Sequence, residues 1–363
     1  MIAEISQPQA VKLSICIATF NRANFIGATL DSILSQLTDD CEIVILDGGS
    51  DDSTESVVRE FVERSGRLRY VRQETNNGVD RDYDRAVELA VGEYCWLMTD
   101  DDLLMPGAVD AVLKAFHRDL SLIILNAEMR DLNMTKVIQP RTIHIDADRL
   151  YKPSDMDSLF VDVRDVLMYV GGFVIKRSIW LDRERERYFG SWFISVGVVF
   201  QDRLPGDALV IAQPYISYRM GNSHTFSPTM FETLMINWPS LIWSLKLSEP
   251  AMKKVCNAEP WRDFSELLLW RGWGFYSVSE YRKYIRPKVR SIREKLVPIL
   301  IAILPGVVAN GLMLLNYSVT GRAYRGVYEA GVILQMLRQS PFYFWGRRQS
   351  DFPKKGVEKV AST

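Results

Sequence analysis

The stretch YCWLMTDDDLLMPG, residues 94–107, decides the fold, because an apolar run ends abruptly in three consecutive carboxylates. An apolar run of this length predicts a buried strand. In an open α/β sheet, the residues just beyond a strand's carboxyl end face the ligand crevice. Three adjacent negative charges repel one another unless water or a divalent cation surrounds them. The run therefore predicts either a cation site or a solvated acidic turn before a helix that starts near Pro106.

Strand and helix patterns alternate on the N-terminal side of this stretch. Short β-rich apolar runs cover 13–20 and 42–46, and apolar residues at helical spacing follow each of them. A third strand is expected at 68–72. A turn and a helix over 83–90 then lead into the acidic stretch. This alternation predicts βαβ units, and hence an α/β fold with a mostly parallel sheet and helices on both faces.

Composition narrows the functional classes. The chain has 363 residues, enough for two domains, and its 44 Lys plus Arg nearly balance its 45 Asp plus Glu. This balance gives no reason to expect nucleic acid as a partner. The four cysteines show no C-x-x-C spacing and no basic, apolar leader precedes Lys12, so we expect a reducing, cytoplasmic compartment.

The regular alternation loosens beyond Ser121. Strands are expected at 122–125 and 208–220, while 148–165 is polar and predicts a loop and a helix. Tryptophans gather in this half of the chain. Core packing is the simpler explanation for them, although one or two exposed rings could stack on sugar faces.

Five short motifs carry a resemblance to a known family. They occur in family order at family spacing: ATFNR (18–22), DGGSDD (47–52), NG (77–78), AVGEY (90–94) and DDD (100–102). Residues 13 to about 116 resemble the nucleotide-sugar-binding half of the family-2 glycosyltransferases, which have a Rossmann-like GT-A fold. Residues 166–177 resemble the family's strand that leads into the acceptor side. Residues 77–83 and 93–98 further resemble the abequosyltransferase-like branch, which transfers deoxysugars in O-antigen assembly.

The resemblance implies a domain organisation. Residues 11–230 would form the GT-A domain, with a donor half at 11–116 and an acceptor half at 117–230. A mainly helical region at 231–346 would follow, with a membrane-associated segment at 282–321. The polar end, 347–363, is expected to be a disordered tail.

The resemblance also implies a donor site with a Mg²⁺ or Mn²⁺ ion. Asp101 is the first choice as metal ligand, Asp102 is a second ligand, and Asp100 shares the site or binds the ribose. Asp47 resembles the acid that reads the base and ribose. The nucleotide site would also be lined by Thr19, Asn21, Arg22 and Asp51. The simpler alternatives are that Asp47 and Asp51 cap a helix and that Arg22 lies on the surface.

Asp80 and Arg81 follow the Asn77-Gly78 turn after one intervening residue, Val79. An acid and a base placed side by side after a turn can bind a sugar hydroxyl and a phosphate respectively. The alternative is a surface ion pair of little energetic worth.

The general base is the gap in the resemblance. Inverting members of the family usually carry a Glu-Asp pair at a helix start, and the corresponding place here reads Ile194-Ser195. Deprotonating an acceptor hydroxyl needs a group of suitable pKa within hydrogen-bond reach. Asp202, Asp182 and His224 are the candidates, and the sequence does not choose between them.

The C-terminal region combines a basic cluster with an apolar run. Residues 282–295 contain seven Lys or Arg and one acid, and 296–321 carry no charge. Prolines and glycines interrupt the run and basic residues flank both sides, which argues against a single membrane span. We expect an interfacial or re-entrant segment, with a buried helical hairpin as the alternative.

These observations predict a metal-dependent glycosyltransferase that uses a nucleotide-sugar donor. A deoxyhexose is one candidate sugar, and a lipid-linked oligosaccharide or polysaccharide is the expected acceptor. The expected place is the cytoplasmic side of a bacterial inner membrane, with peripheral or monotopic attachment. Two alternatives are a sugar nucleotidyltransferase, whose usual Gly-rich phosphate loop is missing from 15–24, and a non-catalytic nucleotide-sugar-binding membrane protein.

Overall fold

The computed structural model describes residues 11–221 and 229–320. These residues pack into two compact units. One comprises 11–221 together with Leu241–Cys256, and the other comprises 229–240 together with 257–320. The domain boundaries predicted from the sequence stay a prediction, and the predicted tail at 347–363 lies outside the described residues.

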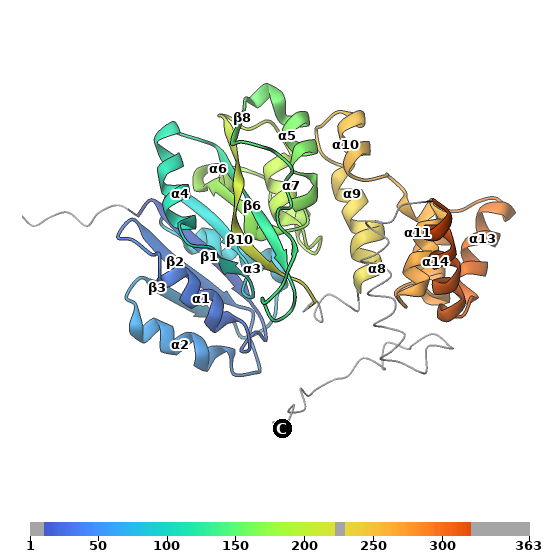
Figure 1. Cartoon of the computed structure of the whole chain (residues 1–363), viewed down its shortest axis with the longest axis horizontal. Helices are drawn as coiled ribbons and strands as arrows, with labels where there is room; N and C mark the ends of the chain where they lie inside the picture. The colour runs from blue at the N-terminus through green and yellow to red at the C-terminus, as the bar shows by residue number, and fades with distance from the viewer. Residues whose placement is uncertain (1–10, 222–228, 321–363) are drawn as a thin grey trace, which may run out of the picture. The chain divides into compact units, whose positions relative to one another are not determined.

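A single mixed sheet is the centre of the first unit. Within the described residues it has ten strands, in the order β3-β2-β1-β4-β9-β6-β10-β5, with β7 paired to β6 and β8 paired to β10 (Figure 1). The strands are β1 (Leu13–Thr19), β2 (Cys41–Asp47), β3 (Leu68–Arg72), β4 (Tyr94–Met98), β5 (Leu103–Leu104), β6 (Leu122–Arg130), β7 (Val137–Gln139), β8 (Arg149–Tyr151), β9 (Phe173–Lys176) and β10 (Ala208–Arg219).

The N-terminal half of this sheet is parallel, as predicted. β3, β2, β1 and β4 run in one direction. Every residue of β1 and β4 is buried, because helices cover both faces. On one face the strands pack against α1 (Ile26–Leu34), α2 (Thr54–Arg64) and α4 (Ala108–Ala115). The alternate strand residues face α3 (Val79–Leu89), which contacts β1 and β2.

Beyond β4 the sheet is mixed, so the prediction of a mostly parallel sheet holds only for the N-terminal half: β6 and β10 are parallel, and the other pairs of this part in the described residues are antiparallel. β9 is antiparallel to both β4 and β6, and β5 and β8 are antiparallel to β10. A parallel pair needs a long crossover, usually a helix, and the alternation of strands with helical patterns stops after α4. β9 is also shorter than the predicted strand at 166–177. Gly171 and Gly172 form a tight turn before it, and a Cβ on Gly172 would lie 3.0 Å from the carbonyl oxygen of Leu125.

Short helices complete the first unit. α5 (Met156–Asp162) occupies the segment predicted as loop and helix, and α10 (Glu249–Val255) packs against it. The backbone N–H of Ser248, which caps α10, donates to Asp157 Oδ1 at 3.1 Å. The remaining helices are α6 (Arg177–Asp182) and α7 (Ile194–Phe200), and α9 (Trp238–Ile242) crosses the division between the units.

The second unit is helical, which confirms the predicted helical C-terminal region. Its helices in the described residues are α8 (Met230–Glu232), α11 (Phe264–Gly272), α12 (Val278–Glu280), α13 (Ile292–Ile303) and α14 (Gly306–Thr320). Trp261 and Trp270 are buried in its core with Phe231 and Tyr276. These two tryptophans therefore have the packing role that the sequence favoured.

The membrane-associated segment predicted at 282–321 contains α13 and α14. Among the described helices, none is by itself long and apolar enough to cross a bilayer. Glu294–Ile303 and Gly306–Met313 reach that length and composition only as a pair, and they bend by 110° at their junction. Membrane association therefore stays a prediction.

Candidate active site

The predicted donor residues follow three adjacent strands that end at one edge of the sheet. The strand register pairs Thr19 with Asp47 and Ile17 with Met98, and Asp100 follows Met98 by two residues. Ligands of open α/β sheets bind at such carboxyl-terminal edges. The structure therefore gathers the loops that carry Thr19, Asn21, Arg22, Asp47, Asp51, Asp100, Asp101 and Asp102. We call this edge the donor edge.

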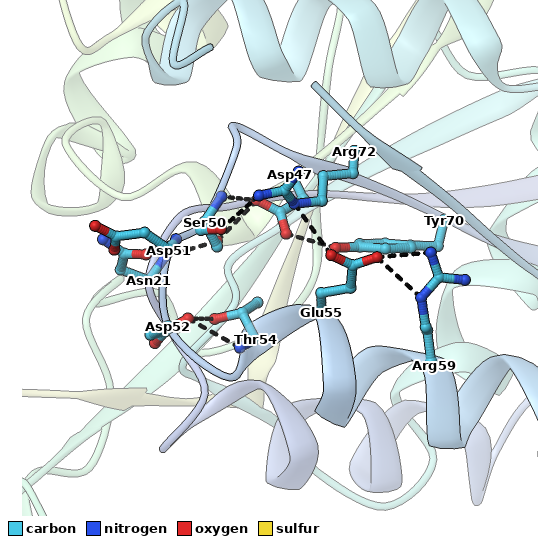
Figure 2. A network of polar contacts seen from close by, with 10 residues as sticks. All are labelled: Asn21, Asp47, Ser50, Asp51, Asp52, Thr54, Glu55, Arg59, Tyr70 and Arg72. Atoms are coloured by element: carbon cyan, nitrogen blue, oxygen red, sulfur yellow. Dashed lines mark hydrogen bonds and ion pairs between the residues drawn. The ribbon is translucent and has the colours of Figure 1, made fainter. Parts of the chain in front are cut away.

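Asp47 shapes the loop after β2 (Figure 2). Its carboxylate is fully buried, and Oδ1 accepts the backbone N–H of Ser50 at 2.7 Å and the Ser50 hydroxyl at 2.8 Å. Oδ2 accepts the Tyr70 hydroxyl at 2.5 Å. Burial, together with this bond to Asp47, raises the pKa of Tyr70 well above its usual value. Asp47 thus fixes the turn that borders the predicted nucleoside site.

Asn21 ties the loops after β1 and β2 together (Figure 2). Its backbone is left-handed, with φ of 57°. Its N–H donates to Ser50 Oγ at 2.9 Å, and its Oδ1 accepts the Asp51 N–H at 2.9 Å. The Asp51 side chain itself is exposed. α2 begins after Ser53 without a side-chain capping bond, so helix capping does not explain Asp47 or Asp51.

The three consecutive aspartates have different environments. Asp102 is fully buried, and its Oδ1 accepts the Arg219 N–H at 2.6 Å while its Oδ2 accepts the Thr99 hydroxyl at 2.5 Å. Burial, followed by the Asp101 charge, raises the pKa of Asp102 well above its usual value. Asp102 therefore joins the acidic loop to the end of β10, which is a structural role.

Arg22 faces the other two aspartates. Its Nε lies 3.4 Å from Asp100 Oδ1, and its Nη2 lies 3.9 Å from Asp101 Oδ2. The Arg22 side chain is 19% exposed, so the alternative of a free surface position does not hold. Burial, together with the neighbouring Asp101 charge, raises the pKa of Asp100 to about 7 even though Arg22 lowers it. This corner of the donor edge therefore attracts positive charge.

The predicted cation fits only part of the acidic triplet. Among the described residues, no group of three or more His, Cys, Asp or Glu side chains is arranged to hold a metal ion. Asp102 does not fit the predicted metal role, because it is buried and both oxygens accept hydrogen bonds. Asp100 and Asp101 already face the Arg22 cation. Two carboxylates, together with diphosphate oxygens, suit Mg²⁺ or Mn²⁺.

Asp80 and Arg81 contact the loop before α7. Asp80 is buried, and its carboxylate accepts the backbone N–H of Trp192 at 2.9 Å and that of Ile194 at 3.1 Å. Trp192 has a left-handed backbone, with φ of 74°, which is uncommon for a residue other than glycine. The Arg81 guanidinium lies 4.3 Å from the centre of the Phe189 ring. In this structure the two residues hold the loop, which we call the 189–194 loop, and the predicted sugar and phosphate contacts stay a prediction.

Burial raises the pKa of Asp80 to about 6, although the backbone N–H groups of the loop lower it. The carboxylate is therefore costly to keep charged, and the loop supplies the donors that compensate it. This is the local reason why the loop adopts its shape.

The general base is not settled by the geometry. α7 begins at Ile194, so the helix start with Ile194-Ser195 is where the resemblance placed it. Asp202 lies beyond the opposite end of α7, is exposed, and pairs with Lys246 Nζ at 2.6 Å. Asp182 is exposed at the end of α6, and His224 lies outside the described residues. The base remains a prediction for all three.

The sequence analysis missed two residues of this region. Asp82 accepts from Gln73 Nε2 at 2.6 Å, and its Oδ2 would lie 2.9 Å from a Cβ on Gly48, directly after Asp47. The signal for Asp82 was that it is an acid two residues after Asp80. It was missed because the helix was predicted to begin only at Tyr83. Arg219 donates from Nε to the Asp101 carbonyl at 2.7 Å, and nothing local in the sequence connects it to the triplet.

Parallel strands whose carboxyl ends are followed by carboxylates, combined with an antiparallel strand beside them, are the arrangement of the GT-A class of nucleotide-sugar-binding folds. Residues 14–180 match the model of glycosyl transferase family 2. These residues are therefore a family-2 glycosyltransferase domain.

Sequence relatives agree with this family. The chain is 26% identical over 188 residues to the GalNAc(5)-diNAcBac-PP-undecaprenol beta-1,3-glucosyltransferase of Campylobacter jejuni, covering 50% of this chain and 57% of that protein. It is 25% identical over 178 residues to an abequosyltransferase of Salmonella typhimurium, covering 46% and 54%. It is also 33% identical over 121 residues to an Escherichia coli chondroitin synthase, covering 33% of this chain and 18% of that one. The chain thus spans less than two thirds of each of these relatives.

A solved structure shares the fold over most of the chain. Residues 1–349 of S. aureus TarS, in complex with UDP, superpose with a TM-score of 0.53 at 15% identity. The match covers 95% of this chain and 97% of that one. At this identity the likeness concerns the fold alone.

Proposed function

We propose that this protein is a metal-dependent glycosyltransferase that moves a sugar from a nucleotide-sugar donor to a hydroxyl group in bacterial surface glycan synthesis. A deoxyhexose is the candidate sugar and a lipid-linked oligosaccharide the candidate acceptor. The proposed place is the cytoplasmic side of a bacterial inner membrane, with peripheral attachment.

One observation carries the proposal. Arg22 faces Asp100 and Asp101 at the edge where β1, β2 and β4 end. Sugar transfer from a nucleotide sugar leaves negative charge on the departing diphosphate, and fixed positive charge at that point lowers the barrier. A divalent cation held by Asp101 and Asp100 would supply most of that charge. The planar Arg22 guanidinium suits diphosphate oxygens at the same place.

The other residues have supporting roles in the proposed reaction. Asp47, Asn21 and Ser50 hold the turn that would surround the nucleoside. Asp80 fixes the 189–194 loop, where the proposed acceptor hydroxyl would be oriented before attack. Holding reactants in place supplies a large part of enzymatic rate enhancement.

The relatives support the finer parts of the proposal. One acts on a glycan joined through diphosphate to undecaprenol, and another is named for transfer of abequose. The shared fold of a protein solved with UDP supports a nucleotide-linked donor. The cation receives its support from the two carboxylates that face Arg22.

The experiment is a donor screen on the purified full-length protein. UDP-, GDP-, CDP- and dTDP-sugars are tested for thermal stabilisation with and without Mn²⁺, and stabilising donors are then tested for transfer to polyprenyl-diphosphate-linked acceptors. A specific donor should raise the melting temperature by mass action, and more so with Mn²⁺. Donor binding without transfer or hydrolysis would favour the non-catalytic alternative, which the Ile194-Ser195 helix start keeps open.

A further inference from the structure

α13 and α14 form a bent helical hairpin with two unlike faces. The inner face belongs to the core of the second unit, where Ile301, Ala302, Ala309 and Met313 are buried. α11 packs against both helices. Hydrogen bonds fix the hairpin to the unit: Arg271 Nε donates to the Leu304 carbonyl at 2.6 Å and the Tyr276 hydroxyl donates to the Pro298 carbonyl at 3.0 Å. The alternative prediction, a buried helical hairpin, is thus correct for the inner face of α13 and α14.

The outer face of the hairpin is apolar and exposed. Ile292 is 81% exposed and Ile303 is 56% exposed, and five further large aliphatic side chains are exposed between and beyond them. On α13 the spacing of four, four and three residues places them on one side of the helix. Helices α13 and α14 carry the orange and red end of the colour bar in Figure 1. We call this set the outer stripe: Ile292, Leu296, Leu300, Ile303, Val307, Val308 and Leu312.

Exposed cations lie at the start of the outer stripe. Arg282, Arg286, Lys288 and Arg290 precede α13, and Lys295 lies in its first turns. The acid of this segment, Glu294, pairs with Arg262 Nη1 at 2.8 Å, so it offsets little of the local positive charge. Along the sequence, the exposed aliphatic side chains of α13 thus follow closely on exposed lysines and arginines.

The chemistry of this surface fits an anionic bilayer better than a protein. Contiguous exposed apolar patches mark interaction sites, and protein interfaces are enriched in aromatic residues, which the outer stripe lacks. Interfacial helices combine an apolar face with Lys and Arg that meet anionic headgroups. The twelve residues of α13 extend only about 18 Å, less than a hydrocarbon core of about 30 Å. The bend of 110° then turns the chain, so a surface position suits the pair.

We infer that the outer stripe inserts into the headgroup and acyl boundary of an anionic lipid bilayer, while the headgroups are contacted by the exposed cations Arg282, Arg286, Lys288, Arg290 and Lys295. This inference rests on the proposed function, which includes peripheral membrane attachment, and it names the residues that would make that attachment. The inference can fail separately from the proposed function, because donor binding and transfer to a water-soluble acceptor do not require the outer stripe.

The test is flotation of full-length protein with vesicles of phosphatidylcholine alone or with 30% phosphatidylglycerol. Wild-type protein should float with the anionic vesicles, and high salt should release only part of it, since screening weakens the charged contacts while apolar burial persists. The double variant Leu296→Glu/Leu300→Glu should need at least about tenfold more lipid for half-maximal binding.

A matched control carries the same charge change elsewhere. Val91 and Met168 are exposed large apolar residues of the first unit, and Val91→Glu/Met168→Glu should bind vesicles like wild type. Lys288→Glu/Arg290→Glu should lose the preference for phosphatidylglycerol. All variants should keep the wild-type melting temperature and donor stabilisation, which separates this test from that of the proposed function.

Three results would overturn the inference. The first is equal flotation of wild type and Leu296→Glu/Leu300→Glu, and the second is no flotation of wild type. The third is a lipid-free wild-type dimer that Leu296→Glu/Leu300→Glu converts to monomer, because a second copy of the chain would then cover the outer stripe.

Discussion

The donor edge and the 189–194 loop are assembled over different distances along the chain. At the donor edge, Asn21 bonds to Ser50 and Arg22 to Thr54, pairs separated by 29 and 32 positions. The 189–194 loop depends on Asp80, 112 positions before Trp192. Consecutive βα units bring their loops to one edge by a general rule, whereas the second contact depends on how distant elements pack. The position of the donor-edge loops can therefore be predicted from local sequence, whereas the contact between Asp80 and the 189–194 loop cannot.

The largest expected effect tests whether the donor edge holds charge for the reaction. Asp101→Asn keeps the shape of the side chain but removes its charge, and should lower transfer at least about 100-fold while the protein stays folded. Transfer rates across a Mn²⁺ titration measure the loss of activity, and thermal melts show whether the variant stays folded. Asp102→Asn is the matched control, because this buried side chain serves Arg219 and Thr99, and it should retain most activity. Wild-type turnover in Asp101→Asn would show that the charge assignment is wrong.

A somewhat smaller effect is expected at Asp47. Asp47→Ala leaves the Ser50 N–H and the Tyr70 hydroxyl without their partner, and so loosens the turn at the predicted nucleoside site. Loss of such a partner costs about 1–3 kcal/mol of stability. If donor binding must restore the order of the turn, a cost of about this size raises the donor Kd about tenfold. Calorimetry with several sugars on one nucleotide is the measurement. The rise should be alike for all of them, and an effect limited to one sugar contradicts a nucleoside role.

The acceptor side of the comparison is tested at Asp80. Asp80→Ala removes the acceptor for two N–H groups of the 189–194 loop and should lower the free energy of unfolding by about 1–3 kcal/mol. Hydrogen exchange at Trp192 and Ile194 should speed up while donor binding changes little. Asp82→Ala is the matched control two residues away, and it should weaken donor binding without affecting that exchange. If both variants behave alike, the two regions are not separate.

Protonation gives a smaller effect on the same side. Burial raises the pKa of Asp80 and of Asp82 to about 6, above about 3.9 for an unfolded Asp. The folded protein then holds protons that the unfolded chain releases, so the free energy of unfolding should fall as pH rises from about 4 to about 6. Denaturant titrations across this range measure the slope, and Asp80→Asn should reduce it. If the pH dependence of the free energy of unfolding is unchanged in Asp80→Asn, the proton that the folded protein retains is bound by a group other than Asp80.

Particular residues show where prediction from sequence succeeded and where it stopped. β3 lies at Leu68–Arg72, where the sequence placed it, because a strand that pairs with β2, the strand before it in the chain, needs only a local signal. The structural role of Asp102 could not be predicted, because the backbone N–H that it binds belongs to Arg219, 117 positions away. β9 was predicted too long, because its start is set by the contact of Gly172 with β6. Local sequence patterns predict where the strands end. Which side chain at those ends remains available for chemistry depends on contacts with residues far away in the sequence.

The smallest expected effect concerns the general base. Asp202 is exposed, and the Lys246 ammonium holds its pKa below the usual range, which makes it a weak base. It also lies at the end of α7 opposite to the one that Asp80 contacts. Asp202→Asn should therefore leave transfer within about twofold of wild type, as should Lys246→Ala, since exposed ion pairs contribute little. A loss of transfer activity of about 100-fold or more in Asp202→Asn, with Lys246→Ala unaffected, would instead identify Asp202 as the base. A catalytic residue of the acceptor half would then also have been predicted correctly from the sequence.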